Sequence, residues 1–251
     1  LNLSFPSGPT TAYRIALSDD YPDQYGAPLG ESLLLRYTTG DLSPYASLST
    51  LGTIGTFNAY TDTALYVRHR NVTRLDLALY ALPLDTFMRL HGYGSYTYRR
   101  DFRPSRGTLV RAWSVPVEGE RNVTHLRAVD MVDEDGEQLP PGVYYLELTA
   151  PEVIARYPDD DPDSMTFVRS TTNLVLKQSA TQSMVWATDL DSGMPVPDLP
   201  VRFFADQSTE YGAGITDDDG LWMADVPTTA DLWDDAFAFV GNGETDPLGI
   251  N

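Results

Sequence analysis

The sequence predicts an all-β protein made of tandem immunoglobulin-like β-sandwich domains. Short runs alternate apolar and polar residues with a period of two, and turn-forming residues close each run. The 19 glycines and 18 prolines are spread along the chain, which suits short strands better than long helices. With 251 residues, the chain exceeds one typical domain and suits two, or two and a fraction.

Residues 1–39 predict a partial or appended immunoglobulin-like domain. Tyr13, Ile15 and Leu17 share one face of an alternating run, and residues 32–39 form a second run. Two or three strands do not close a stable sandwich alone, so we expect half of a domain or an elaboration packed on the next one. Residues 40–59 are rich in Ser, Thr, Gly and Pro and predict a linker that holds at most one weak strand.

Residues 60–152 predict a first sandwich domain. Between two of its strands, Pro83 suits the first turn of a short helix and Gly92 suits its end. The predicted strands of this domain lie at residues 65–68, 74–80, 108–113, 126–129 and 142–148.

Residues 153–171 predict a junction loop, because the aspartates of residues 159–163 repel one another and two prolines interrupt strand pairing.

A second sandwich domain is predicted over residues 172–251. Acidic residues precede glycine at residues 191–193 and 217–220, as in tight hairpin connections. The predicted strands of this domain lie at residues 173–177, 184–188, 201–204, 221–224 and 237–240.

The composition excludes several classes of partner and site. A formal net charge of −19 disfavours nucleic acid and the anionic surface of a membrane, because like charges repel. The absence of cysteine removes disulfides, thiolate metal sites and cysteine nucleophiles. No apolar run approaches the roughly 20 residues of a membrane span, and we expect no signal peptide in the sequence. Since Leu1 to Phe5 already alternate like a strand, we expect an excised segment or a mature chain without its leader.

One short repeat occurs in the sequence. Residues 70–75 are Arg-Asn-Val-Thr-Arg-Leu, and residues 121–126 are Arg-Asn-Val-Thr-His-Leu. The offset is far shorter than an immunoglobulin-like domain of about 100 residues, so we interpret the repeat as a shared way of opening a strand. Both segments and Asn2-Leu3-Ser4 match the Asn-x-Ser/Thr acceptor pattern, which matters only in a eukaryotic secretory pathway.

Several short sequence motifs follow one another in a defined order along the chain. The last block contains a Trp186-Ala187-Thr188-Asp189-Leu190 strand, a turn around Gly193 and a Thr-Asp-x-x-Gly hairpin at residues 216–220. This order resembles a macroglobulin domain of the bacterial alpha-2-macroglobulins. The stretches at residues 66–72, 79–82 and 139–146 resemble the preceding domain of those proteins, and residues 23–29 resemble a turn of another bacterial immunoglobulin-like domain. The resemblance covers nearly the whole chain and implies macroglobulin-type sandwiches.

The resemblance also implies a function. Alpha-2-macroglobulins are large endopeptidase inhibitors: a protease cuts a bait segment, the multidomain shell closes around it, and in many members a Cys–Gln thioester bonds to it. The resemblance therefore implies a non-catalytic scaffold segment of a protease trap, periplasmic or extracellular in the cell envelope. Its implied partners, through the full-length parent, are proteases and a cell-wall-building penicillin-binding protein. Neither nucleic acid binding nor direct membrane insertion is expected.

We expect that this chain is not an enzyme and that it contains no catalytic, cofactor-binding or metal-binding residue. Gly136-Glu137-Gln138 repeats part of the Cys-Gly-Glu-Gln thioester motif of the family, but Asp135 replaces the cysteine and supplies no thiol. The acidic clusters at residues 159–163 and 217–220 lack the full calcium-loop pattern, and we expect solvated loops there.

Neither the histidines nor the tryptophans form a recognisable site. His69, His91 and His125 lack metal-type spacing. We expect the tryptophans in packed cores rather than on a sugar-binding face. They are Trp113, Trp186, Trp222 and Trp233.

Two other functions remain open on sequence alone: an immunoglobulin-like stalk of a surface adhesin, and a carbohydrate-binding module of an extracellular hydrolase. A bait segment and a helical thioester domain in the parent would favour the inhibitor, whereas further repeats would favour the stalk. Binding to glycans would favour the carbohydrate-binding module.

Overall fold

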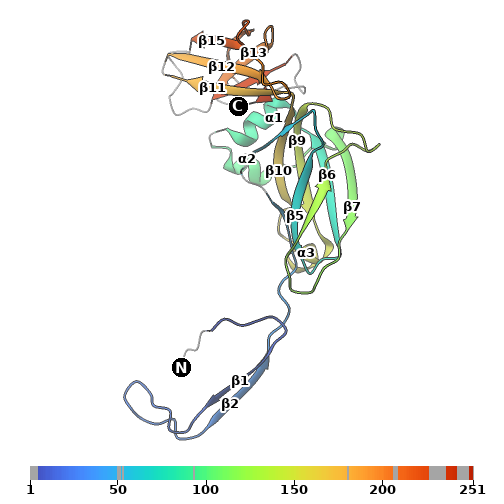
Figure 1. Cartoon of the computed structure of the whole chain (residues 1–251). Coiled ribbons are helices and arrows are strands. Elements are labelled where there is room, and N and C mark those ends of the chain that lie inside the picture. Colours follow the sequence, from blue (N-terminus) through green and yellow to red (C-terminus); the bar gives the residue numbers. More distant parts are fainter. Residues whose placement is uncertain are drawn as a thin grey trace.

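The computed structural model describes residues 5–49, 52, 54–92, 94–179, 181–205, 209–225, 236–241 and 249–250. In this part of the chain, the strands form five sheets, and the three α-helices have only eight, six and six residues. The predicted all-β class is therefore confirmed. Figure 1 shows an N-terminal hairpin that extends away from a central domain, and a C-terminal domain packed at the opposite end.

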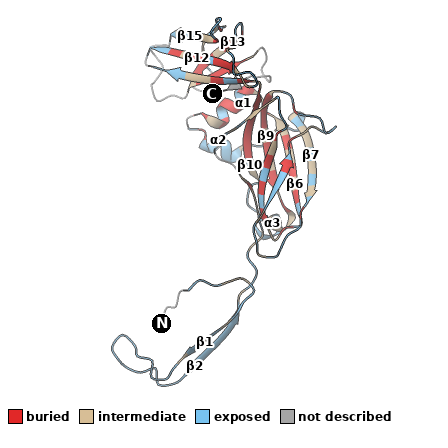
Figure 2. Ribbon diagram, viewed as in Figure 1, coloured by how far each residue is buried: buried red, intermediate tan, exposed pale blue. Residues whose placement is uncertain are grey.

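The N-terminal hairpin consists of β1 (Ala12–Leu17) and β2 (Leu33–Thr38), which pair antiparallel. Side chains directly opposite one another share a face of such a ribbon. One face is therefore entirely apolar, and Figure 2 shows the hairpin without a covering layer. Its residues pair as Tyr13 with Tyr37, Ile15 with Leu35, and Leu17 with Leu33.

The central domain is a sandwich of two sheets. Its larger sheet has the order β4-β10-β9-β6-β7, in which β4 runs parallel to β10 and the other neighbours are antiparallel. The smaller sheet has the order β3-β5-β8. The strands are β3 (Tyr45–Ser49), β4 (Ile54–Asn58), β5 (Ala64–Arg70), β6 (Arg74–Ala81), β7 (Leu109–Pro116), β8 (His125–Asp130), β9 (Gly142–Thr149) and β10 (Asp163–Ser170).

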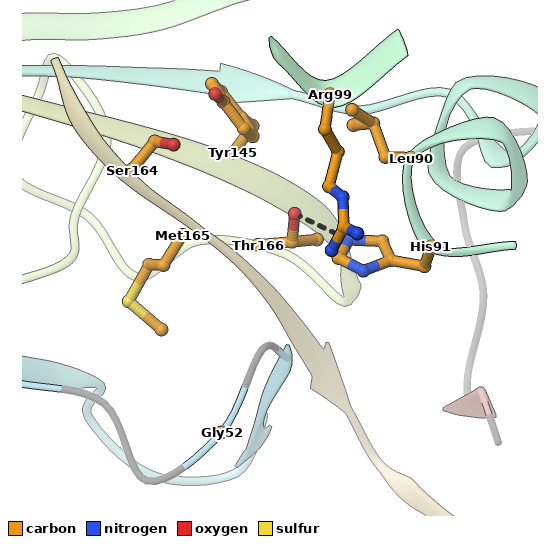
Figure 3. A pocket seen from close by; sticks show the side chains of 8 residues that line it. All are labelled: Gly52, Leu90, His91, Arg99, Tyr145, Ser164, Met165 and Thr166. Carbon is orange, nitrogen blue, oxygen red and sulfur yellow. Dashed lines mark hydrogen bonds between the residues drawn. The ribbon is translucent and has the colours of Figure 1, made fainter. Parts of the chain in front are cut away.

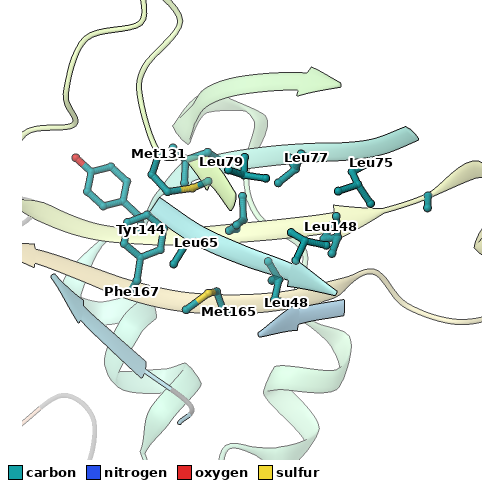
Figure 4. Packing of buried hydrophobic residues seen from close by; sticks show 14 of the residues in the cluster. Leu48, Leu65, Leu75, Leu77, Leu79, Met131, Tyr144, Leu148, Met165 and Phe167 are labelled. Carbon is teal, nitrogen blue, oxygen red and sulfur yellow. The ribbon is translucent and has the colours of Figure 1, made fainter. Parts of the chain in front are cut away.

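The core of this domain lies between the two sheets (Figure 4). Leu75, Leu77 and Leu79 project inward from β6 at the period of two that the sequence shows, and all three are buried. They pack in one cluster with Leu65 of β5 and Phe167 of β10. Two short helical turns, η1 (Arg106–Thr108) and α3 (Pro151–Arg156), lie outside the sheets.

Helices α1 (Leu84–His91) and α2 (Tyr96–Asp101) follow β6, and Figure 1 shows α1 between the larger sheet and the C-terminal domain. The predicted helix after Pro83 is confirmed, with Pro83 at the N-cap and the Gly92 N–H donating to the Met88 carbonyl. Its buried face carries Leu84, Phe87, Met88 and Leu90.

The C-terminal domain is a second sandwich. Its sheets have the orders β11-β12-β15 and β14-β13-β16-β17. Val185, Val201 and Phe203 fill its core, and Trp222 stacks on Phe203 with ring centroids 4.8 Å apart. The strands are β11 (Thr172–Gln178), β12 (Gln182–Asp189), β13 (Pro200–Ala205), β14 (Thr209–Ile215), β15 (Leu221–Asp225), β16 (Ala236–Val240) and β17 (Gly249–Ile250).

Two sequence-based expectations are wrong. The expected linker at residues 40–59 contributes β3 and β4 to the sheets of the central domain, and the expected junction loop at residues 153–171 contains α3 and β10. Strand β10 is inside the larger sheet, and residues 165–170 are all buried. Because both faces of β10 are covered, the burial of its residues is continuous and does not alternate along the strand.

Candidate functional site

The segment that repeats part of the thioester motif is a tight turn. Gly136 has a φ of +85°, in the left-handed region that glycine adopts freely. The Asp133 carboxylate accepts hydrogen bonds from the N–H groups of Asp135 (3.0 Å) and Glu137 (2.8 Å). Gln138 forms an isolated antiparallel β-bridge with Val132, and its side-chain amide donates a hydrogen bond to the Asp62 carboxylate. These contacts give the segment a structural role between strands.

The same turn occurs in all three parts of the molecule. At residues 23–26 and 217–220, an aspartate again accepts from the N–H groups two and four positions later, before a glycine with positive φ. In the other acidic cluster, Asp161 pairs with Arg103, and Asp163 accepts from the Leu48 N–H at 2.7 Å. Among the described residues, no group of three or more potential ligands is placed to hold a metal ion.

The structure brings two of the three histidines together. His69 and His125 face each other across β5 and β8, with ring centroids 5.6 Å apart. Burial, followed by the neighbouring His125 and Arg127, lowers the pKa of His69. Sequence spacing missed this pair because cross-strand register is not visible in a linear sequence.

The tryptophans occupy different environments. Trp222 and Trp113 pack against the two sandwich cores, as expected. The expectation is wrong for Trp186, which is 44% exposed on the outer face of β12. Trp233 lies outside the described residues.

A cavity of about 250 Å³ lies between the helices and the larger sheet of the central domain (Figure 3). The helices contribute His91 and Arg99, and the sheet contributes hydroxyl groups from β9 and β10. Because successive side chains of a strand point to opposite faces, Tyr145, Ser164 and Thr166 lie on the helical face, whereas Tyr144, Leu146 and Phe167 point into the core. The complete lining is Gly52, Leu90, His91, Arg99, Tyr145, Ser164, Met165 and Thr166.

The cavity carries one cation among neutral polar groups. His91 Nε2 lies 2.9 Å from Thr166 Oγ1. Burial, with a smaller contribution from the charge of Arg99, lowers the pKa of His91 to about 4, so the imidazole is neutral at pH 7. Burial also raises the pKa of Tyr145, while the neighbouring Ser164 acts in the opposite direction.

This arrangement is suited to binding and poorly suited to catalysis. An imidazole with a pKa of about 4 is a weak general base at neutral pH. The Thr166 residue beside it is only 3% exposed, so its hydroxyl is poorly reached as a nucleophile. The Glu147 side chain lies on the same face of the sheet as Tyr145. Burial raises the pKa of its carboxyl group, while the neighbouring Tyr80 acts in the opposite direction.

The helices also join the two sandwich domains. Phe87 of α1 contacts Phe237 and Phe239 of β16, with centroid distances of 6.1 and 6.2 Å. These rings belong to one apolar cluster that also contains Val143 of β9 and Val168 of β10. The hydroxyl of Tyr60, which follows β4, also donates to the Asp189 carboxylate at the end of β12, at 2.6 Å.

A buried arginine stabilises the end of β10 near this interface. Arg169 is fully buried, and burial lowers its pKa. Its guanidinium donates to the carbonyl oxygens of Leu139, Ala59 (3.0 Å) and Thr61 (2.8 Å). Hydrogen bonds of this kind offset part of the desolvation cost of a buried cation.

Sequence comparisons match no family model and no curated protein. Solved structures do match. Native alpha-2-macroglobulin from Escherichia coli spanning domains MG0-NIE-MG1 has a TM-score of 0.64 and 14% identity, over 96% of this chain and 75% of that chain. Its NIE-MG1 structure has a TM-score of 0.63 and 15% identity, over 82% of this chain and 96% of that one.

Salmonella alpha-2-macroglobulin reacted with methylamine has a TM-score of 0.67 and 12% identity over 95% of this chain. The fold is that of the MG0-NIE-MG1 part of a bacterial alpha-2-macroglobulin. The predicted macroglobulin-type sandwich fold is thereby confirmed. This chain covers only 14% of the length of the Salmonella alpha-2-macroglobulin. Among the described helices of the macroglobulin-like fold, none has the length and apolar character needed to cross a bilayer.

Proposed function

We propose that this chain is a non-catalytic scaffold segment of an alpha-2-macroglobulin-like endopeptidase inhibitor that traps proteases in the cell envelope. The observation that carries the proposal is the fold match, with TM-scores of 0.64 and 0.67 over 96% and 95% of the chain.

A scaffold must hold its domains in fixed positions, and the interface at α1 suits this role. Phe87, Phe237 and Phe239 are each less than a tenth exposed and form a continuous apolar cluster across the domain boundary. Interfaces that are apolar and well packed restrict domain motion, whereas small polar ones permit it. The segment would thus transmit the position of one domain to the next.

We further propose that the N-terminal hairpin is part of a larger MG0-type sandwich completed by strands other than those described. An isolated two-stranded hairpin is at best marginally stable in water. The apolar face of β1 and β2 leaves Leu33, Leu35 and Tyr37 each more than a third exposed. The structure that includes MG0 matches 96% of this chain, compared with 82% for the structure that lacks it.

Proteases are the proposed partners, and they would be engaged through the full-length parent. The proposed location is the periplasm or the outer surface of the cell envelope. A penicillin-binding protein, which the resemblance also implied, is not supported by the observations above and is left out of the proposal.

The exposed Trp186 does not favour the carbohydrate-binding alternative. Its immediate neighbours on the outer sheet face, Val175, Met184 and Leu221, are apolar. A sugar site also needs several convergent hydrogen-bonding groups around an aromatic ring. Among the described residues that line the hollow of about 400 Å³ on this face, only Lys177 and Asp219 are charged or polar apart from Trp186.

Protease assays test the proposal. The isolated chain is expected to leave the activity of trypsin unchanged on small peptide substrates and on large protein substrates. The full-length parent is expected to shield the trapped protease from large substrates while small peptides still reach its active site. Stoichiometric inhibition by the isolated chain at micromolar concentration would show a direct inhibitory surface and overturn the scaffold role.

A further inference from the structure

We propose that the cavity between α1, α2 and the larger sheet binds a carboxylate group, with Arg99 as its charged partner. This proposal goes beyond the scaffold function and does not rest on it. The ligand is a free carboxylate or the side chain of a glutamate or aspartate in a polypeptide, since the two offer the same chemistry to the cavity.

The helical segment is a basic region on an acidic protein. Residues 84–106 contain five arginines and two aspartates, a formal charge of +3, whereas the whole chain has a net charge of −19. Positive potential confined to one face of an acidic molecule attracts anionic groups to that face. The arginines are Arg89, Arg99, Arg100, Arg103 and Arg106.

Among the described residues, Arg99 has no carboxylate partner, unlike the adjacent Arg100 and the nearby Arg103. Arg100 pairs with Asp101 at 2.9 Å, and Arg103 pairs with Asp161. Figure 3 shows the Arg99 guanidinium directed toward His91 and Thr166 at the cavity. A guanidinium presents parallel N–H donors that match the two oxygens of a carboxylate.

The remaining polar groups of the cavity are neutral hydrogen-bonding groups. Tyr145, Ser164 and Thr166 supply hydroxyl groups to its lining, and Thr166 hydrogen-bonds to the neutral His91. Hydroxyl groups can rotate to donate to an anion. Because Arg99 supplies a single positive charge, the cavity suits a monoanion. A phosphate dianion would leave one charge uncompensated in a partly buried site, which is unfavourable.

The size of the cavity favours a small group. Its volume of about 250 Å³ falls below the roughly 300–1,000 Å³ of pockets that hold drug-sized ligands. It accommodates a carboxylate with a few methylene groups and some water. Glu147 is not among the residues that line the cavity, so its carboxylate does not fill this place.

Titration calorimetry and NMR on the whole chain test the proposal, with sodium acetate, an oligoglutamate peptide and inorganic phosphate as probes. Acetate or oligoglutamate is expected to bind and to shift the resonances of the His91 imidazole, and phosphate is expected to bind more weakly. Arg99→Gln should reduce the affinity about tenfold or more, because a hydrogen-bonded charge is lost. Arg100→Gln is the matched control, since it removes the same charge from the same helix outside the cavity.

The results distinguish a free carboxylate from a polypeptide side chain, and a specific site from a diffuse attraction to the basic surface. Tighter binding of oligoglutamate than of acetate supports a polypeptide ligand, and equal binding supports a free carboxylate. No binding of either probe overturns the proposal. Equal losses in the Arg99→Gln and Arg100→Gln variants also overturn it, because they would show a diffuse attraction to the basic surface. Thermal unfolding of each variant verifies that a lost signal does not reflect a lost fold.

Discussion

The side chains of Asn71 and Asn122 are hydrogen-bonded to each other, with 2.9 Å between Asn71 Nδ2 and Asn122 Oδ1. These residues occupy equivalent positions in the two Arg-Asn-Val-Thr segments of the sequence. Both have positive φ values, +54° and +66°, a conformation that asparagine tolerates better than most residues. The segments do precede strands β6 and β8, as the sequence predicts, and in addition they meet in space.

The asparagine pair also fixes the connection to the N-terminal hairpin. Asn71 donates to the Leu42 carbonyl at 2.7 Å, and Asn122 accepts from the Leu42 N–H at 2.8 Å. Asn122 also donates to Thr10 and Asp41 at 3.0 Å each. The pair thus connects residues at the base of the hairpin to the central domain.

The first prediction concerns this pair. Asn71→Gly and Asn122→Gly keep the positive φ accessible and remove the side-chain hydrogen bonds. Each is expected to destabilise the chain in urea and to speed proteolysis next to Leu42. The double variant should show a coupling free energy of about 0.5–3 kcal/mol, as for residues that share one network. Strictly additive effects would show that the two asparagines act independently. Thr124→Ala, at a nearby exposed position, is the control.

The second prediction concerns the interface between the sandwiches. Phe87 is 1% exposed, so Phe87→Ala is expected to cost about 3–5 kcal/mol. Since the ring packs on Phe237 and Phe239, the loss should also uncouple the two domains and split calorimetric unfolding into two transitions. Tyr96→Ala, on the exposed α2, should leave the unfolding profile unchanged. A uniform shift of the whole profile would contradict a specific role in coupling.

The third prediction compares two glycines in the same type of turn. Gly136 and Gly220 have φ values of +85° and +72°, so alanine costs about 1–2 kcal/mol at either position through backbone strain. A Cβ at Gly136 meets nothing within 4 Å, whereas a Cβ at Gly220 overlaps the carbonyl oxygen of Ala187. Gly220→Ala should therefore lower the urea midpoint clearly more than Gly136→Ala. Equal effects would show that the backbone around Gly220 relaxes freely.

The fourth prediction concerns pH. The folded pKa of His91, about 4, lies below the ordinary value of 6.5, so unfolding takes up a proton between these values. The contribution of neutral His91 to the free energy of unfolding is present above pH 6.5. It is lost as the pH falls to about 4, by at most about 3 kcal/mol.

His91→Gln removes this titration and keeps an amide that can bond to Thr166. Urea unfolding at several pH values should show a flatter dependence for the variant between pH 6.5 and 4. His69 and the carboxylates titrate in both proteins, so the difference between the curves isolates His91. Parallel curves would mean that His91 is protonated as easily in the folded chain as in the unfolded one.

Local features of the fold were predictable from the sequence. The alternation of Leu75, Leu77 and Leu79 identified a core strand, and Pro83 and Gly92 marked the two ends of α1. The aspartate–glycine turn at residues 217–220 was also predictable. Each of these features depends on backbone sterics or on side-chain period within a few residues, so the order of residues alone contains it.

The candidate cavity was less predictable. His91 attracted attention only as a lone histidine, and Arg99, Tyr145 and Thr166 carried no sequence signal. They come from two helices and two strands that are distant in the chain and are brought together by packing. A basic segment at residues 84–106 within an acidic chain was the one available hint of a functional surface.

By itself, the sequence determined where most strands, turns and the first helix form, because those choices are made by neighbours along the chain. Only the tertiary structure decided that β10 is an inner strand, that Asn71 meets Asn122, and that α1 joins two sandwiches. These features depend on which layers cover a strand and which distant residues face each other. Burial and register arise from the whole packed molecule, so a local pattern of residues does not specify them.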